Sequence, residues 1–137
     1  MTRQEMDRLI DEHFRYEATN DLEGVLSTLT EDVVHDVVGF PDSPVRGREA
    51  ARPFYEALYR DLAGESVEPL NRFYGEDFLV DEVVWHGRAV GRPFGLAGNA
   101  RPVSFRMLHV FQFRDGLIAR ENVWLDTAAI REQLGED

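Results

Sequence analysis

The stretch VSFRMLHVFQFRDGLIARENVWL, residues 103–125, decides the fold of this chain. Apolar and polar residues alternate on both sides of Arg114-Asp115-Gly116, which is the pattern of two β-strands that each bury one face. The Asp-Gly pair supplies the backbone conformations that a tight turn needs. The sequence therefore predicts a β-hairpin with strands over Val103–Phe113 and Leu117–Leu125.

The turn of this hairpin determines which side chains face each other. A two-residue turn would place His109 opposite Asn122, whereas a three-residue turn with a glycine bulge at Gly116 would place it opposite Glu121. The odd-numbered positions of both strands are the more apolar ones, so alternation favours pairing of odd with odd. We therefore expect the three-residue turn, with His109 and Glu121 paired on an otherwise apolar surface.

Two more strands are predicted before the hairpin, over Val67–Tyr74 and Phe78–His86, because apolar residues recur there with period two. The segment that follows, Gly87–Pro102, contains four glycines and two prolines and is expected to be a mobile loop. Phe94 and Leu96 would give this loop apolar tips. We therefore expect it to act as a lid over a binding site.

The first half of the chain has helical periodicity instead. Thr2 and Glu5 form a capping-box sequence at its start, and Gly64 is expected to end the third helix. The predicted elements are helices over Met6–Ala18, about Leu22–Leu29 and Arg48–Leu62, a strand over Val33–Val38, and a terminal helix over about Thr127–Leu134. Residues 1–137 are therefore expected to form one α+β domain, with N-terminal helices packed on one face of a curved, mostly antiparallel sheet.

Composition excludes several classes of protein. The 26 acidic and 15 basic residues give a net charge of −11, which disfavours binding to nucleic acid or to an anionic membrane surface. Cysteine is absent, and no signal peptide or long apolar run is visible, so we expect a cytoplasmic protein. All basic residues are arginine, which indicates a bacterium with a G+C-rich genome. The four histidines lack metal-site spacing, and phosphate-binding loops and serine-nucleophile motifs are missing, so no metal or cofactor is expected.

Three segments carry a resemblance that covers nearly the whole chain. They are Asp21-Leu22-Glu23-Gly24-Val25 leading to Leu29–Asp36, then Gly47-Arg48-Glu49-Ala50, and the hairpin start His109–Ile118. The chain resembles the nuclear transport factor 2-like superfamily, and within it the branch of SnoaL-like polyketide cyclases and ketosteroid isomerases. The resemblance implies a cone-shaped, cystatin-like α+β roll with a pocket between sheet and helices. The same scaffold carries isomerases, cyclases, dehydratases, epoxide hydrolases and non-catalytic binding proteins, so it does not fix the function.

The resemblance also implies candidate catalytic residues. The acid or base that follows the first strand falls at Asp36, although strict alignment places Val37 there. His109 occupies the position where the isomerases hold an oxyanion-stabilising carboxylic acid. The acid/base region of the cyclases contains Glu121 and Asn122. We therefore take Asp36, His109 and Glu121 as catalytic candidates; the alternative roles are a core histidine paired with one partner and an aspartate that hydrogen-bonds within a loop.

Six further residues are candidates for substrate binding. The first-helix tyrosine of the isomerases maps to His13, Arg15 or Tyr16, and Tyr16 could serve in packing alone. Asp81 shares a strand face with Trp85 and is expected to point inward. The full set of binding candidates is His13, Tyr16, Asp81, Trp85, Met107 and Phe111.

These residues favour a small-molecule enzyme without a cofactor. Asp36 would take a proton next to a carbonyl group of a hydrophobic substrate, and His109, oriented by Glu121, would stabilise the oxyanion. Isomerisation, cyclisation and dehydration share that step. The alternatives are a binding module with the same pocket and a subunit whose sheet docks a partner. Ile118, Val110 and Trp124 are expected on the outer face of the sheet, which predicts a homodimer through that face. The expected partners are thus a small hydrophobic molecule and a second copy of the chain.

Overall fold

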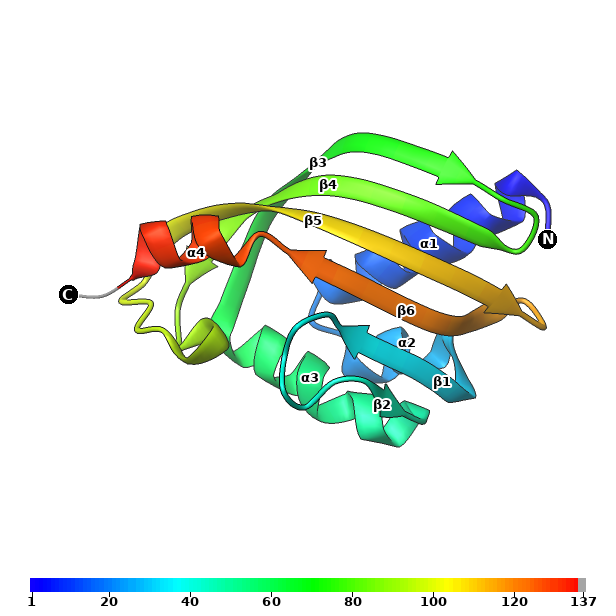
Figure 1. Ribbon diagram of the computed structural model, residues 1–137, viewed down its shortest axis with the longest axis horizontal. Helices are drawn as coiled ribbons and strands as arrows, with labels where there is room; N and C mark the ends of the chain where they lie inside the picture. The colour runs from blue at the N-terminus through cyan, green and yellow to red at the C-terminus, as the bar shows by residue number, and fades with distance from the viewer. Residues whose placement is uncertain (136–137) are drawn as a thin grey trace.

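A curved, unclosed sheet of six strands forms one layer of the protein, and helices α1, α2 and α3 cover one of its faces (Figure 1). The computed structural model describes residues 1–135. The helices are α1 (Arg3–Ala18), α2 (Leu22–Ser27), α3 (Arg48–Asp61) and α4 (Thr127–Leu134), with a 3₁₀ turn η1 at Pro93–Gly95; the strands are β1 (Leu29–Val37), β2 (Val45–Arg46), β3 (Leu62–Tyr74), β4 (Phe78–Ala89), β5 (Arg101–Arg114) and β6 (Leu117–Leu125). This architecture confirms the predicted α+β class.

The strands lie in the order β2-β1-β6-β5-β4-β3, and neighbours are antiparallel except for β1 and β6, which are parallel. The first strand of the sequence therefore lies beside the last one. This pairing closes the helical half of the chain onto the hairpin half, and it brings residues of β1 next to residues of β6. In the part of the chain that the structure describes, no helix has both the length and the apolarity to cross a membrane.

Short polar residues begin the helices as the sequence predicts. The Thr2 side chain accepts a hydrogen bond from the backbone N–H of Glu5, whose carboxylate accepts one from the N–H of Thr2. Asp21 caps α2 in the same way, and Asp126 caps α4. Helix α3 ends at Asp61, one residue before the predicted end, but Gly64 is not its stop, because the chain enters β3 directly at Leu62 and Gly64 lies within that strand.

The hairpin between β5 and β6 has a two-residue turn, which corrects the predicted three-residue turn. Asp115 and Gly116 both have positive φ, 55° and 75°, and Arg114 pairs with Leu117. These are the backbone angles of a type I′ turn, which Asp-Gly adopts readily. A register shift follows within the strands, between the pairs that contain Gln112 and Phe113.

This shift restores the pairing of odd with odd positions, but with different partners from those expected. His109 lies opposite Val123, and Glu121 lies opposite Phe111. His109 and Glu121 are therefore diagonal neighbours on the inner face. The extra residue in β6 also turns Ile118 inward, where it is fully buried, so its predicted place on the outer face is wrong.

The predicted loop over Gly87–Pro102 is shorter in the structure, because Ala89 still pairs with Arg101 at the ends of β4 and β5. The connecting segment, residues 90–100, is held by side chains. The Arg101 guanidinium donates to the carbonyl oxygens of Gly98 and Ala97, 3.0 and 2.6 Å away. Phe94 reaches the pocket described below, whereas Leu96 does not line it.

Two groups of buried apolar residues form the core. One fills the space between α1, α2, α3 and the sheet around Met6, Ile10 and Phe111. The other lies under α4, around Phe105 and Ile130. The helices and the curved sheet leave a cavity beside these two groups, and this cavity is the candidate site.

Candidate functional site

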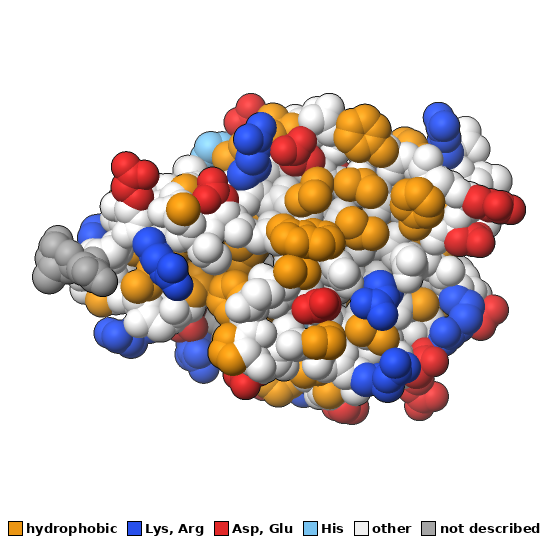
Figure 2. Space-filling model, viewed as in Figure 1, with side chains coloured by type: hydrophobic (Ala, Val, Ile, Leu, Met, Phe, Trp, Pro, Cys, Tyr) orange, Lys and Arg blue, Asp and Glu red, His pale blue; other side chains and the backbone are white. Residues whose placement is uncertain are grey.

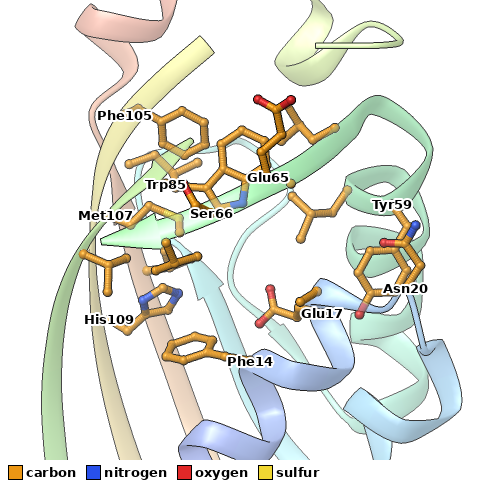
Figure 3. Close-up of a pocket in the computed structure, with 18 of the residues that line it drawn as sticks. Phe14, Glu17, Asn20, Tyr59, Glu65, Ser66, Trp85, Phe105, Met107 and His109 are labelled. Atoms are coloured by element: carbon orange, nitrogen blue, oxygen red, sulfur yellow. The ribbon is translucent and has the colours of Figure 1, made fainter. Parts of the chain in front are cut away.

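A pocket of about 490 Å³ lies between helices α1 and α3 and the inner face of strands β3–β6. Its walls are mainly apolar. Figure 3 shows Tyr59 from α3 and Glu17 from α1 on one side and Trp85, Phe105, Met107 and His109 of the sheet on the other, with Phe14 of α1 next to His109. The remaining lining residues are Arg15, Ala18, Asn20, Phe54, Leu58, Leu62, Gly64, Glu65, Ser66, Val67, Val83, Phe94, Glu121, Val123 and Leu125.

Glu121 of β6 is the centre of a buried polar cluster at the inner end of this pocket. Its side chain is 3% exposed, and its Oε1 accepts a hydrogen bond from the hydroxyl of Tyr55 at 2.7 Å. The Nε2 atoms of His13 and His35 lie 3.5 and 3.8 Å from the same oxygen, and Nε2 of His109 lies 3.9 Å from Oε2. Three histidines from α1, β1 and β5 therefore surround one carboxylate.

The hydrogen bonds of His13 determine its charge. The Thr28 hydroxyl donates to the carbonyl oxygen of Val25 at 2.6 Å, so it can only accept from Nδ1 of His13, 2.8 Å away. The other ring nitrogen, Nε2, faces two carboxylates, since Glu17 Oε2 is 3.1 Å away and Glu121 Oε1 3.5 Å. A lone pair at Nε2 would be repelled by both, so His13 is doubly protonated.

The pKa values of the cluster agree with that assignment. Burial would lower the pKa of His13, but the charges and hydrogen bonds of Glu121 and Glu17 raise it to about 10. Burial would raise the pKa of Glu121, and the positive charge of His13 instead holds it far below its usual value. Burial lowers the pKa of both His35 and His109, so these two rings are neutral near pH 7.

Four polar side chains of the site face the pocket itself. His109 is 4% exposed, and its Nδ1 has no hydrogen-bonding partner among the described residues. Glu121 lies beneath it. On the helical side, Tyr59 lines the pocket. Its hydroxyl is buried and makes no hydrogen bond in the described part of the chain, and burial raises its pKa, so it stays protonated. Glu17 projects from α1 into the space between Tyr59 and His109 (Figure 3).

Asp36 does not belong to this cluster, which corrects the expectation that it shares a cavity with His109 and Glu121. In the parallel pairing of β1 with β6, His35 lies beside Glu121 and Asp36 beside Asn122. Successive residues of a strand point to opposite faces, so the buried His35 points inward and Asp36 outward. Asp36 does not line the pocket.

The predicted binding residues are divided between several places. Trp85 and Met107 line the pocket. His13 and Phe111 lie behind its wall; both are fully buried, and Phe111 stacks on His109 with ring centres 5.2 Å apart. Tyr16 lies outside, where its hydroxyl donates to Glu12 at 2.9 Å.

Asp81 points inward as expected and lies opposite His109 in the pairing of β4 with β5, but it does not line the pocket. Its Oδ1 accepts a hydrogen bond of 2.8 Å from Nε of Arg72, which also binds Asp7 and Asp11 of α1. The side chain is 4% exposed and is absent from the pocket lining. The arginine neutralises Asp81 and ties β3 and β4 to α1.

Sequence analysis missed His35, Glu17, Tyr55 and Tyr59. A signal for three of them exists, because His13 and Glu17 are four residues apart on α1, as are Tyr55 and Tyr59 on α3. Polar residues with that spacing lie on one face of a helix. Two such faces directed at one sheet would indicate a polar site. Within residues 1–135, no three histidine, aspartate or glutamate side chains are placed to hold a metal ion.

The protein has a cone-shaped α+β fold whose apolar pocket ends on a buried carboxylate and imidazoles. Such a pocket is typical of a class of proteins that bind small molecules. The sequence profile of the SnoaL-like domain matches residues 10–121 of the chain. The protein therefore belongs to the SnoaL-like domain family of the nuclear transport factor 2-like superfamily, which confirms the resemblance seen in the sequence. None of the curated proteins compared with the chain is significantly similar to it in sequence.

Solved structures of similar fold carry diverse names. TsrD from Streptomyces laurentii is 21% identical, with a TM-score of 0.84 and 98% of each chain covered. A proposed polyketide cyclase from Xanthomonas campestris pv. campestris is 22% identical, with a TM-score of 0.85 over 96% of this chain and 98% of the other. A limonene-epoxide-hydrolase-like epoxide hydrolase from M. tuberculosis is 20% identical, with a TM-score of 0.74 over 96% and 90%. At such identities the likeness establishes the fold.

Proposed function

We propose that this chain is a cofactor-independent enzyme of the cytoplasm that moves a proton on a hydrophobic, carbonyl-bearing small molecule. The observation that carries the proposal is the pairing of a neutral imidazole, His109, with an ionised carboxylate, Glu121, at the inner end of an apolar pocket. An imidazole that is neutral near pH 7 can accept a proton. A buried carboxylate beside it stabilises the imidazolium that forms.

The first chemical step is removal of a proton from carbon next to the carbonyl group. The C–H bond breaks, the proton passes to His109, and the electron pair moves to the carbonyl oxygen. Glu121 is a poor proton acceptor, because the charge of His13 holds its pKa low, so it serves as the fixed counter-charge of His109. Asp36, on the other face of the sheet, takes no part.

Tyr59 is the group that would stabilise the oxyanion. Its side chain lines the pocket, and its buried hydroxyl remains protonated and has no partner among the described residues. A donor held ready for a developing negative charge contributes more inside an apolar pocket than in water. His109 then returns its proton, at another carbon in an isomerisation or to a departing hydroxide in a dehydration. In a cyclisation, the carbanion carbon attacks a second carbonyl, and the alkoxide that forms takes the proton back from His109.

Deuterium exchange tests this step without knowledge of the substrate. The protein is incubated in D₂O with a panel of hydrophobic ketones and diketones, and loss of the α-proton signal is followed by NMR. We expect His109→Gln to slow exchange by about 10²–10⁴. The matched control is His86→Gln, because His86 lies on the same sheet, bonds Ser104 and does not line the pocket. Equal rates in both variants would refute the proposed role of His109.

A binding module is the second candidate, and the position of Asp36 favours it, because the pocket lacks the carboxylate base that the resemblance implies. The same experiment separates the two functions. Ketones that shift the NMR signals of Trp85 or Met107 and exchange no faster than in buffer would indicate binding without catalysis.

We also propose that two copies of the chain pair through the outer face of the sheet. Figure 2 shows apolar side chains gathered over the middle of this face. Trp124 and Phe73 are 40% and 59% exposed, and Trp124 pairs with Leu108 while Val110 pairs with Val80. A monomer rarely exposes so continuous an apolar patch. Sedimentation should show a dimer at micromolar concentration and a monomer for Trp124→Arg.

A further inference from the structure

The charges of the buried cluster do not cancel. His13 carries one positive charge between the carboxylates of Glu17 and Glu121, at 3.1 and 3.5 Å, while His35 and His109 are neutral. One negative charge therefore remains at the inner end of the pocket. Glu121 also accepts a hydrogen bond from the hydroxyl of Tyr55. Among the described residues, the Glu17 carboxylate forms an ion pair with His13 and makes no other polar contact. The excess charge lies on the side of Glu17.

Glu17 presents this charge to the pocket. Its side chain is 22% exposed, it lines the cavity, and Figure 3 shows its carboxylate directed into the open space. A second acceptor lies across that space. His109 is 96% buried, and with Nε2 protonated toward Glu121 its unpartnered Nδ1 carries the lone pair that takes the substrate proton in the proposed function.

The walls suit a cation as well. Six aromatic rings line the pocket, and the faces of such rings attract positive charge. Among the described residues, Arg15 is the one basic side chain other than His109 in the lining, and its guanidinium lies over the ring of Tyr16, which does not line the pocket. An anionic ligand would meet Glu17 without compensation. The rings are Phe14, Phe54, Tyr59, Trp85, Phe94 and Phe105.

From this geometry we infer that the pocket selects a ligand with a cationic nitrogen, an ammonium on an otherwise apolar or aromatic body, which binds Glu17 and packs against the aromatic rings. The inference deepens the proposed function and rests on it, because the cation would belong to the carbonyl-bearing substrate. Glu17 then sets specificity and holds the substrate, while His109 moves the proton. The overall charge of −11 would also favour the approach of a cation.

Three probes with the same indole ring test the inference: tryptamine, tryptophol and indole-3-propionate carry an ammonium, a hydroxyl and a carboxylate. Titration calorimetry at pH 7 should give at least about tenfold tighter binding of tryptamine than of tryptophol, with indole-3-propionate weakest. Glu17→Gln keeps the shape of the side chain and should reduce the preference to about twofold. Glu65→Gln, at a carboxylate that also lines the pocket but does not contact His13, is the matched control and should keep most of the preference.

The outcomes separate this inference from the proposed chemistry. His109→Gln should abolish deuterium exchange yet keep the preference for tryptamine, since Glu17 is intact. If the wild-type protein catalyses no deuterium exchange but still prefers tryptamine, the proposed enzymatic function is refuted and the inferred cation site is retained. Tryptophol binding as tightly as tryptamine, a preference unchanged in Glu17→Gln, or no binding of any probe at millimolar concentration would overturn the inference.

Discussion

Two buried carboxylates on the inner face of the sheet, Asp81 and Glu121, are neutralised in opposite ways. Asp81 on β4, opposite His109, is bound by Arg72, whose guanidinium reaches it at 2.8 Å and also contacts two aspartates of α1. Glu121 is surrounded by three histidines and one tyrosine. An arginine stays charged at any pH that a protein survives, whereas histidines gain and lose protons near neutrality.

The two clusters also differ in their position relative to the pocket. Asp81 and Arg72 line no part of the pocket, while the Glu121 cluster forms the inner end of it. A fixed cation suits a structural tie between β3, β4 and α1. Titratable partners beside a cavity suit proton transfer. Burial of a carboxylate alone is therefore a weak indicator of function, and the identity of its partner is the better one.

Removal of each cation should give the largest difference between the two clusters. His13→Leu leaves Glu121 buried without its counter-charge, and we expect a loss of about 3–5 kcal/mol in the free energy of unfolding. Arg72→Leu should cost less, about 1–3 kcal/mol, because the Arg72 side chain is 23% exposed and its truncation would let water reach Asp81. Urea denaturation at pH 7 measures both. Equal losses would contradict the contrast between the clusters.

The pH dependence of stability should distinguish the clusters next. The folded-state pKa of His13 is about 10, above the value of about 6.5 in the unfolded chain. Its contribution is complete below pH 6.5 and is lost as the pH rises towards 10, a fall of roughly 2–4 kcal/mol. Because the chain has no lysine, few other groups titrate in this range.

The loss of stability at acidic pH comes from histidines whose pKa is lowered, not raised, in the folded state. Burial lowers the pKa of His35 and His109, so the folded state resists their protonation, and stability falls as the pH drops below about 6.5. Stability should therefore peak near neutral pH. In urea denaturation from pH 5 to 10, Arg72→Leu should keep the shape of the wild-type curve, and His13→Leu should lose its alkaline slope. An alkaline slope retained in His13→Leu would refute the assigned charge of His13.

Tyr59→Phe should affect activity more than stability. Its hydroxyl has no partner in the described structure, so its removal should change the free energy of unfolding by less than about 0.5 kcal/mol. Loss of the oxyanion donor should slow deuterium exchange by about 10–100-fold. Tyr55→Phe is the matched control, because its hydroxyl bonds Glu121 and its loss should destabilise the fold by about 1–2 kcal/mol. A stability loss in Tyr59→Phe equal to that in Tyr55→Phe would count against the division of roles.

The sequence was sufficient for the fold, because period-two alternation and capping residues are local signals. The hairpin strand β6 and the helix α4 have the predicted bounds, Leu117–Leu125 and Thr127–Leu134. The turn at Asp115-Gly116 was misassigned because the bulge lies inside the β5–β6 pairing and not at the turn. The alternation of apolar and polar residues changes phase there, and no glycine or proline marks the position.

The site was predictable only in part. His109 and Glu121 were found as polar residues on an apolar strand face, which is a local signal. Asp36 was selected as the carboxylate nearest to the position that strict alignment gives to Val37, and a shift of one residue reverses the face of a strand. Here the inward-facing polar residue is the other neighbour of Asp36, His35. The partners of Glu121 on α1 and α3 depend on how the helices pack on the sheet, which no local pattern determines.

Asp36→Asn should give the smallest effect, and it tests that reversal directly. The side chain points away from the pocket, is partly exposed and makes no hydrogen bond or ion pair within the described residues, so we expect a change of less than about 0.5 kcal/mol in stability. Deuterium exchange should stay within about twofold of wild type, because no reacting atom in the pocket can reach Asp36 across the sheet. His35→Asn, one residue earlier, should disturb both measurements, because its ring lies 3.8 Å from Glu121. A loss of exchange of about 10²-fold or more in Asp36→Asn with unchanged stability would instead place the catalytic base at Asp36 and show that β1 adopts another register in the active protein.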